Sequence, residues 1–551
     1  MPSGARFGRQ RDARPVVRPS MPNVLYIVWD DAAMAAWNAF GGLIDTPSMR
    51  WLAARGLRYS QWHTTALSSS TRSSLLTGRD CDADAAGRGG AGERDKIMPS
   101  EAATLAEILG AIGYRTYCLG KWHLSPAQAG AVASARVTWP LARGFDRYYG
   151  FLGNATSQWY PDLVYDDRVV DPPYSPAEGY HLSRDLADMA MEFIADGTGS
   201  APGQPWLCYL AFGANGAPRE WARACRDRFA MGYDRYREIA LGNMKRLGVV
   251  PEDTRLAPAD RYPARPAAAS EDPARPWQSL SEEHKQIGCL LAESAAACCS
   301  FTDHQIGRLL GCLEESGLLR DTIVVACSAG AAEAGQRGEA DFLAGWAWNA
   351  DAAGDAADFD HLSAGWARAF GTPYNVPRHC SPGGSATPLI ISWAPGMQGV
   401  AGGIRDQYHH AVDIVPTILD CAGIEPPLSV NGRPQQPLHG VSMRYTFTAP
   451  EAPSARRTQF YRAPGSLAVY HDGWKAVTAH RHAASGAGRW ELYHVSADRA
   501  ETRDVAASYP EKVAQLAAMW RANAIEPGRQ PGLAVGRRRP AQRAGGSPVA
   551  G

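Results

Sequence analysis

Strand-length apolar runs recur along this chain, and helical patterns separate them. The runs lie at Asn23–Trp29, 114–119, 206–212, 322–327 and 388–393. They are continuous rather than alternating, which is typical of strands that are buried on both faces. Strands that alternate with helices predict an α/β fold, with a large mixed, mostly parallel sheet flanked by helices.

Some connecting segments can also be interpreted. Ser279 and Glu282 have the spacing of a capping box and predict the start of a long helix that reaches about Gly317. Residues 251–277 and 343–385 are rich in Ala, Pro, Asp and Gly. We expect both segments to be long loops near the mouth of a site.

The pattern changes near residue 458 to short strands followed by a helix. The sequence therefore predicts a main domain at 21–457 and a small C-terminal α+β subdomain at 458–524. Residues 1–20 are rich in Arg and Pro, and residues 525–551 are rich in Arg, Gly, Pro and Ala. We expect these two terminal segments to be a disordered extension and a disordered tail.

The charge of the chain indicates which partners it is not expected to bind, and its cysteine content indicates the cell compartment. The 56 basic and 56 acidic residues cancel, so no general attraction to nucleic acid or to an anionic membrane is expected. No apolar run approaches the ~20 residues of a membrane-spanning helix. The 11 cysteines include no Cys-x-x-Cys pair, and residues 1–20 lack the apolar core of a secretory signal. We therefore expect a cytoplasmic protein with reduced thiols.

Paired carboxylates close the first apolar run. Asp30 and Asp31 follow Trp29 directly. Lys121 and Ser328 also fall at the ends of predicted strands, and sites in α/β sheets form where the carboxyl ends of strands meet. Carboxylate oxygens are the ligands that hard divalent cations prefer. Asp30 and Asp31 are therefore candidate metal ligands.

The most specific motif is SSSTRSSLLTGR at residues 68–79. It resembles the signature of the sulfatase family, Cys/Ser-x-Pro/Ala-x-Arg followed by Leu-Thr-Gly-Arg. Three further blocks also resemble that family: GKWH at 120–123, QYHHAVDIVPT at 407–417 and WELY at 490–493. The resemblance spans roughly residues 22–524. It implies an alkaline-phosphatase-like α/β architecture and a sulfuric-ester hydrolase of arylsulfatase type.

The resemblance also implies roles for single residues. In the family, the Cys or Ser is oxidised to formylglycine, which attacks sulfur while bound to a divalent cation, usually calcium. Ser68 takes the nucleophile position, and Asp30 and Asp31 match two metal ligands. The residues that match those holding the formylglycine are Arg72, Lys121 and His123.

Part of the family pattern is altered around the nucleophile and the metal. Ser70 replaces the Pro/Ala of the signature, so we expect Ser68 to remain without conversion to formylglycine. Ala329 and Gly330 stand where the family has an Asp-Asn pair that completes the metal site. Calcium takes about six to eight oxygen ligands, so two carboxylates and water make a weak site. We expect Ca²⁺ to be weakly bound or absent.

The substrate side is altered too. Gly216 replaces the first histidine of the family's His-Ala-Pro-His stretch, and Arg219 replaces the second. The family lysine that precedes a Glu-Gly-Gly triplet has no match, and Arg378 is among the basic residues nearest to that position. Arg219 and Arg378 are therefore candidate substrate-binding residues.

Three alternatives for the site stay open. Arg72, Lys121 and His123 either form an anion pocket or pair with the two aspartates. Ser68 is either a nucleophile or a helix-capping serine. Carboxylates of a long loop could also replace the missing metal ligands. The candidates are Glu339, Asp341 and Asp351. The residues expected to be structural are His409, His410 and Asp413.

Three functions follow from these observations. By resemblance the chain is an aryl-sulfate hydrolase, and the altered residues predict that it is catalytically impaired or inactive. The first alternative is a non-catalytic protein that binds a small sulfate ester, another anion or a partner protein. The second is a phosphatase that uses Ser68 as an unmodified nucleophile.

Overall fold

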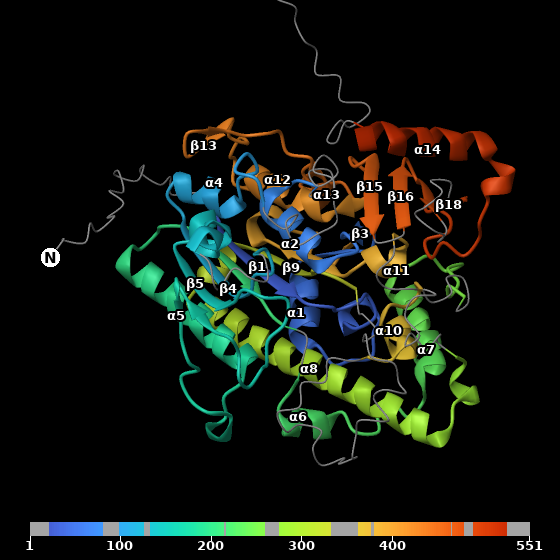
Figure 1. Cartoon of the computed structure of the whole chain (residues 1–551), viewed down its shortest axis with the longest axis horizontal. Helices are drawn as coiled ribbons and strands as arrows, with labels where there is room; N and C mark the ends of the chain where they lie inside the picture. The colour runs from blue at the N-terminus through green and yellow to red at the C-terminus, as the bar shows by residue number, and fades with distance from the viewer. Residues whose placement is uncertain are drawn as a thin grey trace, which may run out of the picture.

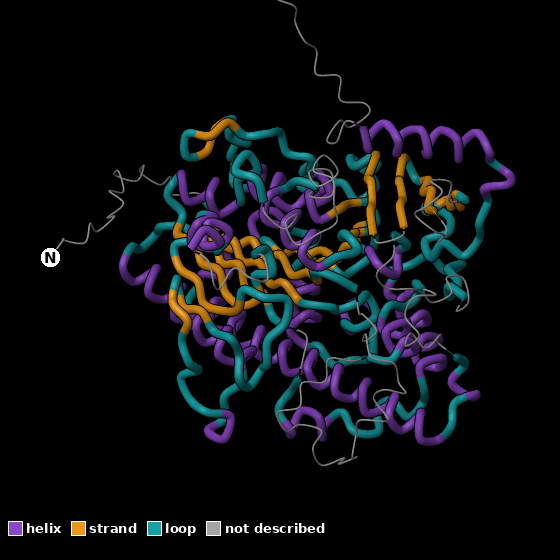
Figure 2. The backbone as a smooth tube through the Cα atoms, in the orientation of Figure 1, coloured by secondary structure: helices purple, strands orange, loops and turns teal. Residues whose placement is uncertain are grey.

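A large central sheet with helices on both faces forms the main body, and a smaller sheet forms the C-terminal part (Figures 1 and 2). The structure is a computed structural model. It describes residues 21–80, 98–125, 133–213, 216–258, 275–331, 362–375, 380–463, 466–478 and 489–525. The α/β class and the mostly parallel sheet predicted from the sequence are confirmed.

The central sheet has ten strands in the order β11-β2-β10-β9-β1-β8-β4-β5-β6-β7. Five strands in its middle run parallel: β9 (Thr322–Ser328), β1 (Asn23–Trp29), β8 (Trp206–Ala211), β4 (Arg115–Lys121) and β5 (Arg147–Phe151). The remaining strands are β2 (Leu57–Tyr59), β6 (Val164–Tyr165), β7 (Arg168–Val169), β10 (Leu389–Ser392) and β11 (Ile404–Arg405). Parallel pairing brings the carboxyl ends of β1, β4, β8 and β9 to one edge of the sheet.

Strand β1 divides the molecule into two cores because its side chains alternate across the sheet. Leu25 and Ile27 belong to one buried cluster and Val24 and Tyr26 to the other. The first core is covered by α1 (Pro47–Arg55), α5 (Leu182–Ser200), α6 (Arg219–Ala224), α7 (Tyr233–Leu247), α8 (Glu282–Glu315) and α10 (Ala364–Phe370). The second is covered by α2 (Ser68–Thr77), α4 (Leu105–Ala111), α12 (Ile414–Cys421) and α13 (Tyr445–Thr448). Figure 1 shows α2, α4 and α12 above the sheet and α1, α5 and α8 below it.

Two expectations about connecting segments were wrong in detail. The long helix α8 is capped by Ser281, whose hydroxyl accepts a bond from the His284 amide, whereas Ser279 belongs to a preceding turn of 3-10 helix. The expected loop at 343–385 contains α10 and the short helix α11 (Pro382–Ser385). The 343–385 sequence hides these helices because α10 is only seven residues long and α11 only four.

The C-terminal part begins at β15 (Thr458–Ala463). Strand β15 pairs antiparallel with β16 (Ser466–His471), and β17 (Trp474–Thr478) and β18 (Trp490–His494) complete a four-stranded sheet. Helix α14 (Pro510–Ile525) packs on this sheet, where Leu516 joins an apolar cluster. Two small pairs remain: β3 (Trp62–His63) with β12 (His409–His410), and β13 (Ser429–Val430) with β14 (Arg433–Pro434). In the described part of the chain, no helix has the length and apolarity needed to cross a membrane.

Two buried histidines should make the fold sensitive to acid. His181 and His410 accept the backbone N–H groups of Ser183 and Val412 through Nδ1, at 3.2 and 3.4 Å. Burial lowers the pKa of each imidazole to about 3, below the value of about 6.5 expected in the unfolded chain. The unfolded state therefore binds more protons, and this contribution to stability is lost as the pH falls from about 6.5 toward the folded pKa.

The variant His181→Gln tests this expectation by urea denaturation at a series of pH values. Its neutral side chain can accept the Ser183 amide without titrating. Burial raises the pKa of Asp303 to about 6, so its effect on stability changes with pH in the direction opposite to that of the histidines. The variant is therefore compared with the wild type at each pH, because both proteins contain Asp303. The free energy of unfolding should depend on pH less in the variant, by roughly 1.4 kcal/mol per pH unit. Identical pH dependence in the two proteins would contradict the assignment.

Candidate functional site

Ser68 is the first residue of α2 and lies at the sheet edge where the parallel strands end. The N-cap of the helix is Leu67, which makes no side-chain capping bond. The Ser68 hydroxyl instead donates to Asp30 Oδ1 at 3.1 Å and accepts a bond from Arg72 Nε at 3.2 Å. Ser68 is therefore not a helix-capping serine, and its side chain is directed at the end of β1.

Asp30 is the centre of a compact cluster of charges. Its Oδ1 accepts a bond from an Arg72 guanidinium nitrogen at 2.9 Å, and its Oδ2 accepts one from Lys121 Nζ at 2.6 Å. A second Arg72 nitrogen donates to the backbone carbonyl of Lys121 at 3.1 Å. All three charged side chains are less than a tenth exposed. The cluster links β1, α2 and β4, and Asp30 is bonded to both cations.

These contacts control the protonation of Asp30. Burial alone would raise the pKa of the Asp30 carboxyl, but the charges of Lys121 and Arg72 and their hydrogen bonds hold that pKa well below its usual range. A carboxylate with so low a pKa is a poor acceptor of the Ser68 proton. Asp30 therefore stabilises the neighbouring cations and does not serve as a base that activates Ser68.

Asp31 and His123 follow the ends of β1 and β4. Both residues adopt the left-handed backbone region, with φ of 51° and 57°, which is uncommon outside glycine. The backbone N–H of His123 donates to the Leu152 carbonyl at 3.2 Å. Such turns are frequent at functional sites, and here they end both strands sharply beside Ser68.

The end of β9 lies next to Asp31 but contributes no side-chain ligand. A Cβ atom placed on Gly330 would lie 3.2 Å from Asp31 Oδ1. A side chain at position 330 would therefore face Asp31. Ser328 is occupied elsewhere, because its hydroxyl accepts the Ala32 amide at 3.0 Å and donates to the Gly330 carbonyl at 2.7 Å.

The residues present do not fit a complete divalent-cation site. Calcium needs about six to eight oxygens, and Asp30 already uses both carboxylate oxygens in ion pairs. Among the residues that the structure describes, no three His, Cys, Asp or Glu side chains are grouped so that they could hold a metal ion. Glu339, Asp341 and Asp351, the candidate replacement ligands, lie outside the described residues.

The space beside Gly216 is filled by the side chain of another residue, Trp159. Gly216 has a φ of 74°, and a Cβ atom built on it would lie 2.5 Å from two ring atoms of Trp159. The Trp159 ring is 7% exposed and contacts the His181 ring edge-on, with centroids 5.3 Å apart. No side chain at position 216 can be accommodated unless Trp159 moves.

Sequence reasoning missed two residues of this region, Asn154 and Trp159. The exposed Asn154 accepts a bond from Lys121 Nζ on its Oδ1 at 3.1 Å, which places it at the rim of the cluster. Both residues lie in the segment that follows β5, outside every motif that resembles the family. The sequence of such a connecting segment does not indicate which residue its side chains will contact.

The two predicted substrate-binding residues have different outcomes. Arg219 begins α6, in the segment that follows β8. Arg378 lies outside the described residues. The structure therefore brings together Asp30, Ser68, Arg72 and Lys121, while a role for Arg219 or Arg378 stays a prediction.

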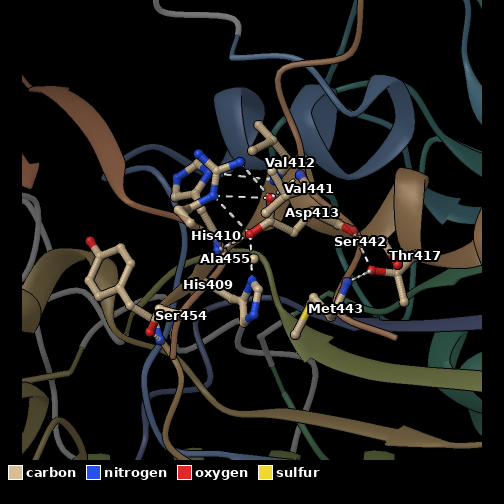
Figure 3. A network of polar contacts seen from close by, with 12 residues as sticks. His409, His410, Val412, Asp413, Thr417, Val441, Ser442, Met443, Ser454 and Ala455 are labelled. Atoms are coloured by element: carbon tan, nitrogen blue, oxygen red, sulfur yellow. Dashed lines mark hydrogen bonds and ion pairs between the residues drawn. The ribbon is translucent and has the colours of Figure 1, made fainter. Parts of the chain in front are cut away.

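The block at 407–417 that resembles the family has a structural role, as expected (Figure 3). The buried Asp413 carboxylate accepts bonds from His409 Nδ1 at 2.8 Å and from the amides of His410 and Val441 at 3.0 and 2.8 Å. Arg456 forms a two-pronged ion pair with the same carboxylate, with a shortest contact of 2.5 Å. Arg456 directly precedes the C-terminal subdomain, so this network fixes that part to the main body.

Comparison with known proteins agrees with this fold. The chain is 28% identical to an arylsulfatase of Klebsiella aerogenes over 446 residues, which covers 77% of this chain and 91% of that protein. It is 26% identical to an uncharacterized sulfatase of Schizosaccharomyces pombe, covering 91% and 92% of the two chains.

Solved structures are similar in fold. The sulfatase PsFucS1 from Pseudoalteromonas sp. has a TM-score of 0.57 at 17% identity, and the match covers 92% of this chain and 90% of that one. A structure solved in complex with its substrate D-glucosamine-2-N,6-O-disulfate has a TM-score of 0.56 at 19% identity, covering 91% and 97%. The family model described as Sulfatase matches residues 22–424. On this evidence, the chain belongs to the sulfatase family.

Proposed function

We propose that sulfuric-ester hydrolysis is lost or strongly reduced in this member of the family. The observation that carries the proposal is the glycine at position 330, which faces Asp31 Oδ1 without supplying a ligand. The Ala329 side chain, fully buried in an apolar cluster, supplies none either. A metal centre that holds nucleophile and sulfate is needed for the family's chemistry, and two of its expected ligands are absent from these positions.

The charge balance of the site supports the same proposal. Asp30 and Asp31 carry two negative charges, and Lys121 and Arg72 carry two positive charges. Among the described residues, these four side chains therefore balance in charge without a divalent cation, and a cation beside Lys121 and Arg72 would add positive charge. We propose that the ion pairs now perform the structural role that a metal ion would otherwise have, and that Ser68 stays an unmodified serine.

Two alternatives have less support. A phosphatase with Ser68 as nucleophile also needs a strong electrophilic centre, and the low pKa of Asp30 leaves that residue unsuited as a base. A non-catalytic anion pocket would need free positive charge, whereas Lys121 and Arg72 are bonded to Asp30. If a ligand does bind, a small sulfate ester is the class that the family match favours.

We also propose a cytoplasmic location. All ten cysteines in the described ranges are free thiols. Disulfides are typical of secreted proteins and rare in the cytosol, so this state supports a reducing compartment.

The ion cluster should stabilise the fold without metal. Asp30→Asn leaves Lys121 and Arg72 buried with one fewer charge partner, which should lower the free energy of unfolding by roughly 3–5 kcal/mol. Glu314→Gln is a matched control, because it removes an exposed ion pair with Arg55 at 3.7 Å and should cost less than about 1 kcal/mol. Urea denaturation with and without EDTA measures both. A loss that occurs only when calcium is present would contradict the metal-free role.

Adding a carboxylate at position 330 should create calcium dependence. Gly330→Asp places a second negative charge against Asp31, so the variant should be less stable than the wild type without a cation. Calcium at about 100 times its dissociation constant should then stabilise it by roughly 2.7 kcal/mol. Gly330→Asn has the same shape without the charge and should respond less. The melting temperatures of the two variants and the wild type, with and without calcium, test this expectation. A clear stabilisation of the wild type by calcium would contradict our proposal.

Hydrolysis assays test the function directly. We expect purified protein to show no turnover of 4-nitrophenyl sulfate or 4-nitrophenyl phosphate above that of Ser68→Ala, with calcium, magnesium or manganese added. Sulfate turnover that is lost in Ser68→Ala would instead reveal a working sulfatase. Phosphate turnover alone, lost in the same variant, would identify an unmodified serine nucleophile.

A further inference from the structure

A cavity lies away from Ser68, among α1, α6 and α8. Its volume is about 390 Å³, and its lining includes Asp45, Ser48, Trp221, Ser300, His304 and Arg308. Figure 1 shows α6 and α8 below the central sheet, whereas α2 lies above it. The size is within the range of small-molecule pockets.

Trp221 forms a fixed aromatic wall of this cavity. Its ring is half-buried and packs edge-on against Phe301 with centroids 5.6 Å apart. The ring of His304 lies 5.3 Å from it on the same side of α8. The two contacts hold the indole in one orientation, so it offers a preformed flat surface to a ring or a cation.

The two serine hydroxyls of the lining can only accept hydrogen bonds from a ligand. Ser48 Oγ donates its proton to the Asp303 carbonyl at 2.7 Å, and Ser300 Oγ donates its proton to the Asp45 carbonyl at 2.8 Å. A hydroxyl has one proton and two acceptor lone pairs. Gly307 leaves room for the Ser48 side chain, because a Cβ atom at position 307 would lie 2.5 Å from Ser48 Oγ.

Asp45 adds a negative charge to these acceptors. Its carboxylate is exposed and accepts a long hydrogen bond of 3.4 Å from the side-chain amide of Asn38. Within the described residues, no basic side chain lies in ion-pair distance of Asp45. Arg308, the cation of the lining, is bonded to Asp188 at 2.7 Å and to Gln305 at 2.8 Å. Its charge is therefore offset by its own partner.

His304 does not contribute a positive charge at neutral pH. Partial burial lowers the pKa of its imidazole, and the nearby charges of Arg308 and Arg184 lower it further. The imidazole is therefore mostly neutral at pH 7. The cavity combines an aromatic wall, two hydroxyl acceptors and one carboxylate.

We propose that this cavity binds a ring compound that carries a protonated primary amine. An ammonium group has three donors and no acceptor, which matches Ser48 Oγ, Ser300 Oγ and the Asp45 carboxylate. A cation over an indole face is also attracted by the ring. The ring of the ligand packs against Trp221. This site is independent of the proposed function of the Ser68 region.

Binding is tested with two amines and their hydroxyl analogues on the full chain. The amines are 2-phenylethylamine and D-glucosamine, and the analogues are 2-phenylethanol and D-glucose. Isothermal titration at pH 7 should show binding of at least one amine in the millimolar range or tighter and weaker binding of its analogue. Binding of the first amine alone indicates an arylalkylamine as ligand, and binding of the second alone indicates an amino sugar.

Variants locate the binding. Asp45→Asn should weaken amine binding roughly two- to fivefold, because the contact between an ammonium group and an exposed carboxylate is a weak one. Asp167→Asn removes an exposed carboxylate elsewhere, which is 58% exposed, and should leave binding unchanged. Trp221→Leu should weaken binding similarly; because it alters packing, its melting temperature is checked, and Asp45→Asn carries the test if it misfolds. No binding of either amine, equal binding of the hydroxyl analogues, or unchanged binding by Asp45→Asn would overturn the proposal.

Discussion

The ion pairs between Asp30, Lys121 and Arg72 determine how the rest of the site is arranged. They join the end of β1 to the end of β4 and to the first turn of α2, three elements that are far apart in sequence. Two buried cations need a buried anion, because an unpaired charge in the interior costs several kcal/mol. The position of Ser68 follows from this requirement, since its hydroxyl lies between Asp30 and Arg72.

Much of the fold could be predicted from the sequence, because continuous apolar runs report burial on both faces of a sheet. The runs at β1, β4, β8, β9 and β10 all became strands of the central sheet. Charges at strand ends, such as Asp30 and Lys121, could be placed for the same reason. Helix boundaries were less certain. The capping-box spacing favoured Ser279, which has Glu282 three residues further on, but the residue that caps α8 is Ser281, which has His284 at that distance.

The contacts across the site could not be predicted from the sequence. Asn154 reaches Lys121 from a loop, and Trp159 occupies the space beside Gly216. Both contacts depend on how a segment folds back over the edge of the sheet. The spacing of apolar residues in the sequence does not indicate this. The choice between an anion pocket and internal ion pairs had the same origin. It depended on whether Lys121 and Arg72 point at Asp30 or toward solvent. Only the distances between these side chains in the folded structure answer that question.

The contact between Trp159 and Gly216 restricts which residues position 216 can hold. A histidine at position 216 would meet the indole ring, so Trp159 would have to change first or at the same time. Replacing a buried tryptophan with a small residue costs about 3–5 kcal/mol, a large fraction of the stability of a typical domain. A substitution that places a side chain at position 216 therefore meets a stability barrier unless position 159 changes with it. The two positions are coupled, and we expect them to change together rather than one at a time.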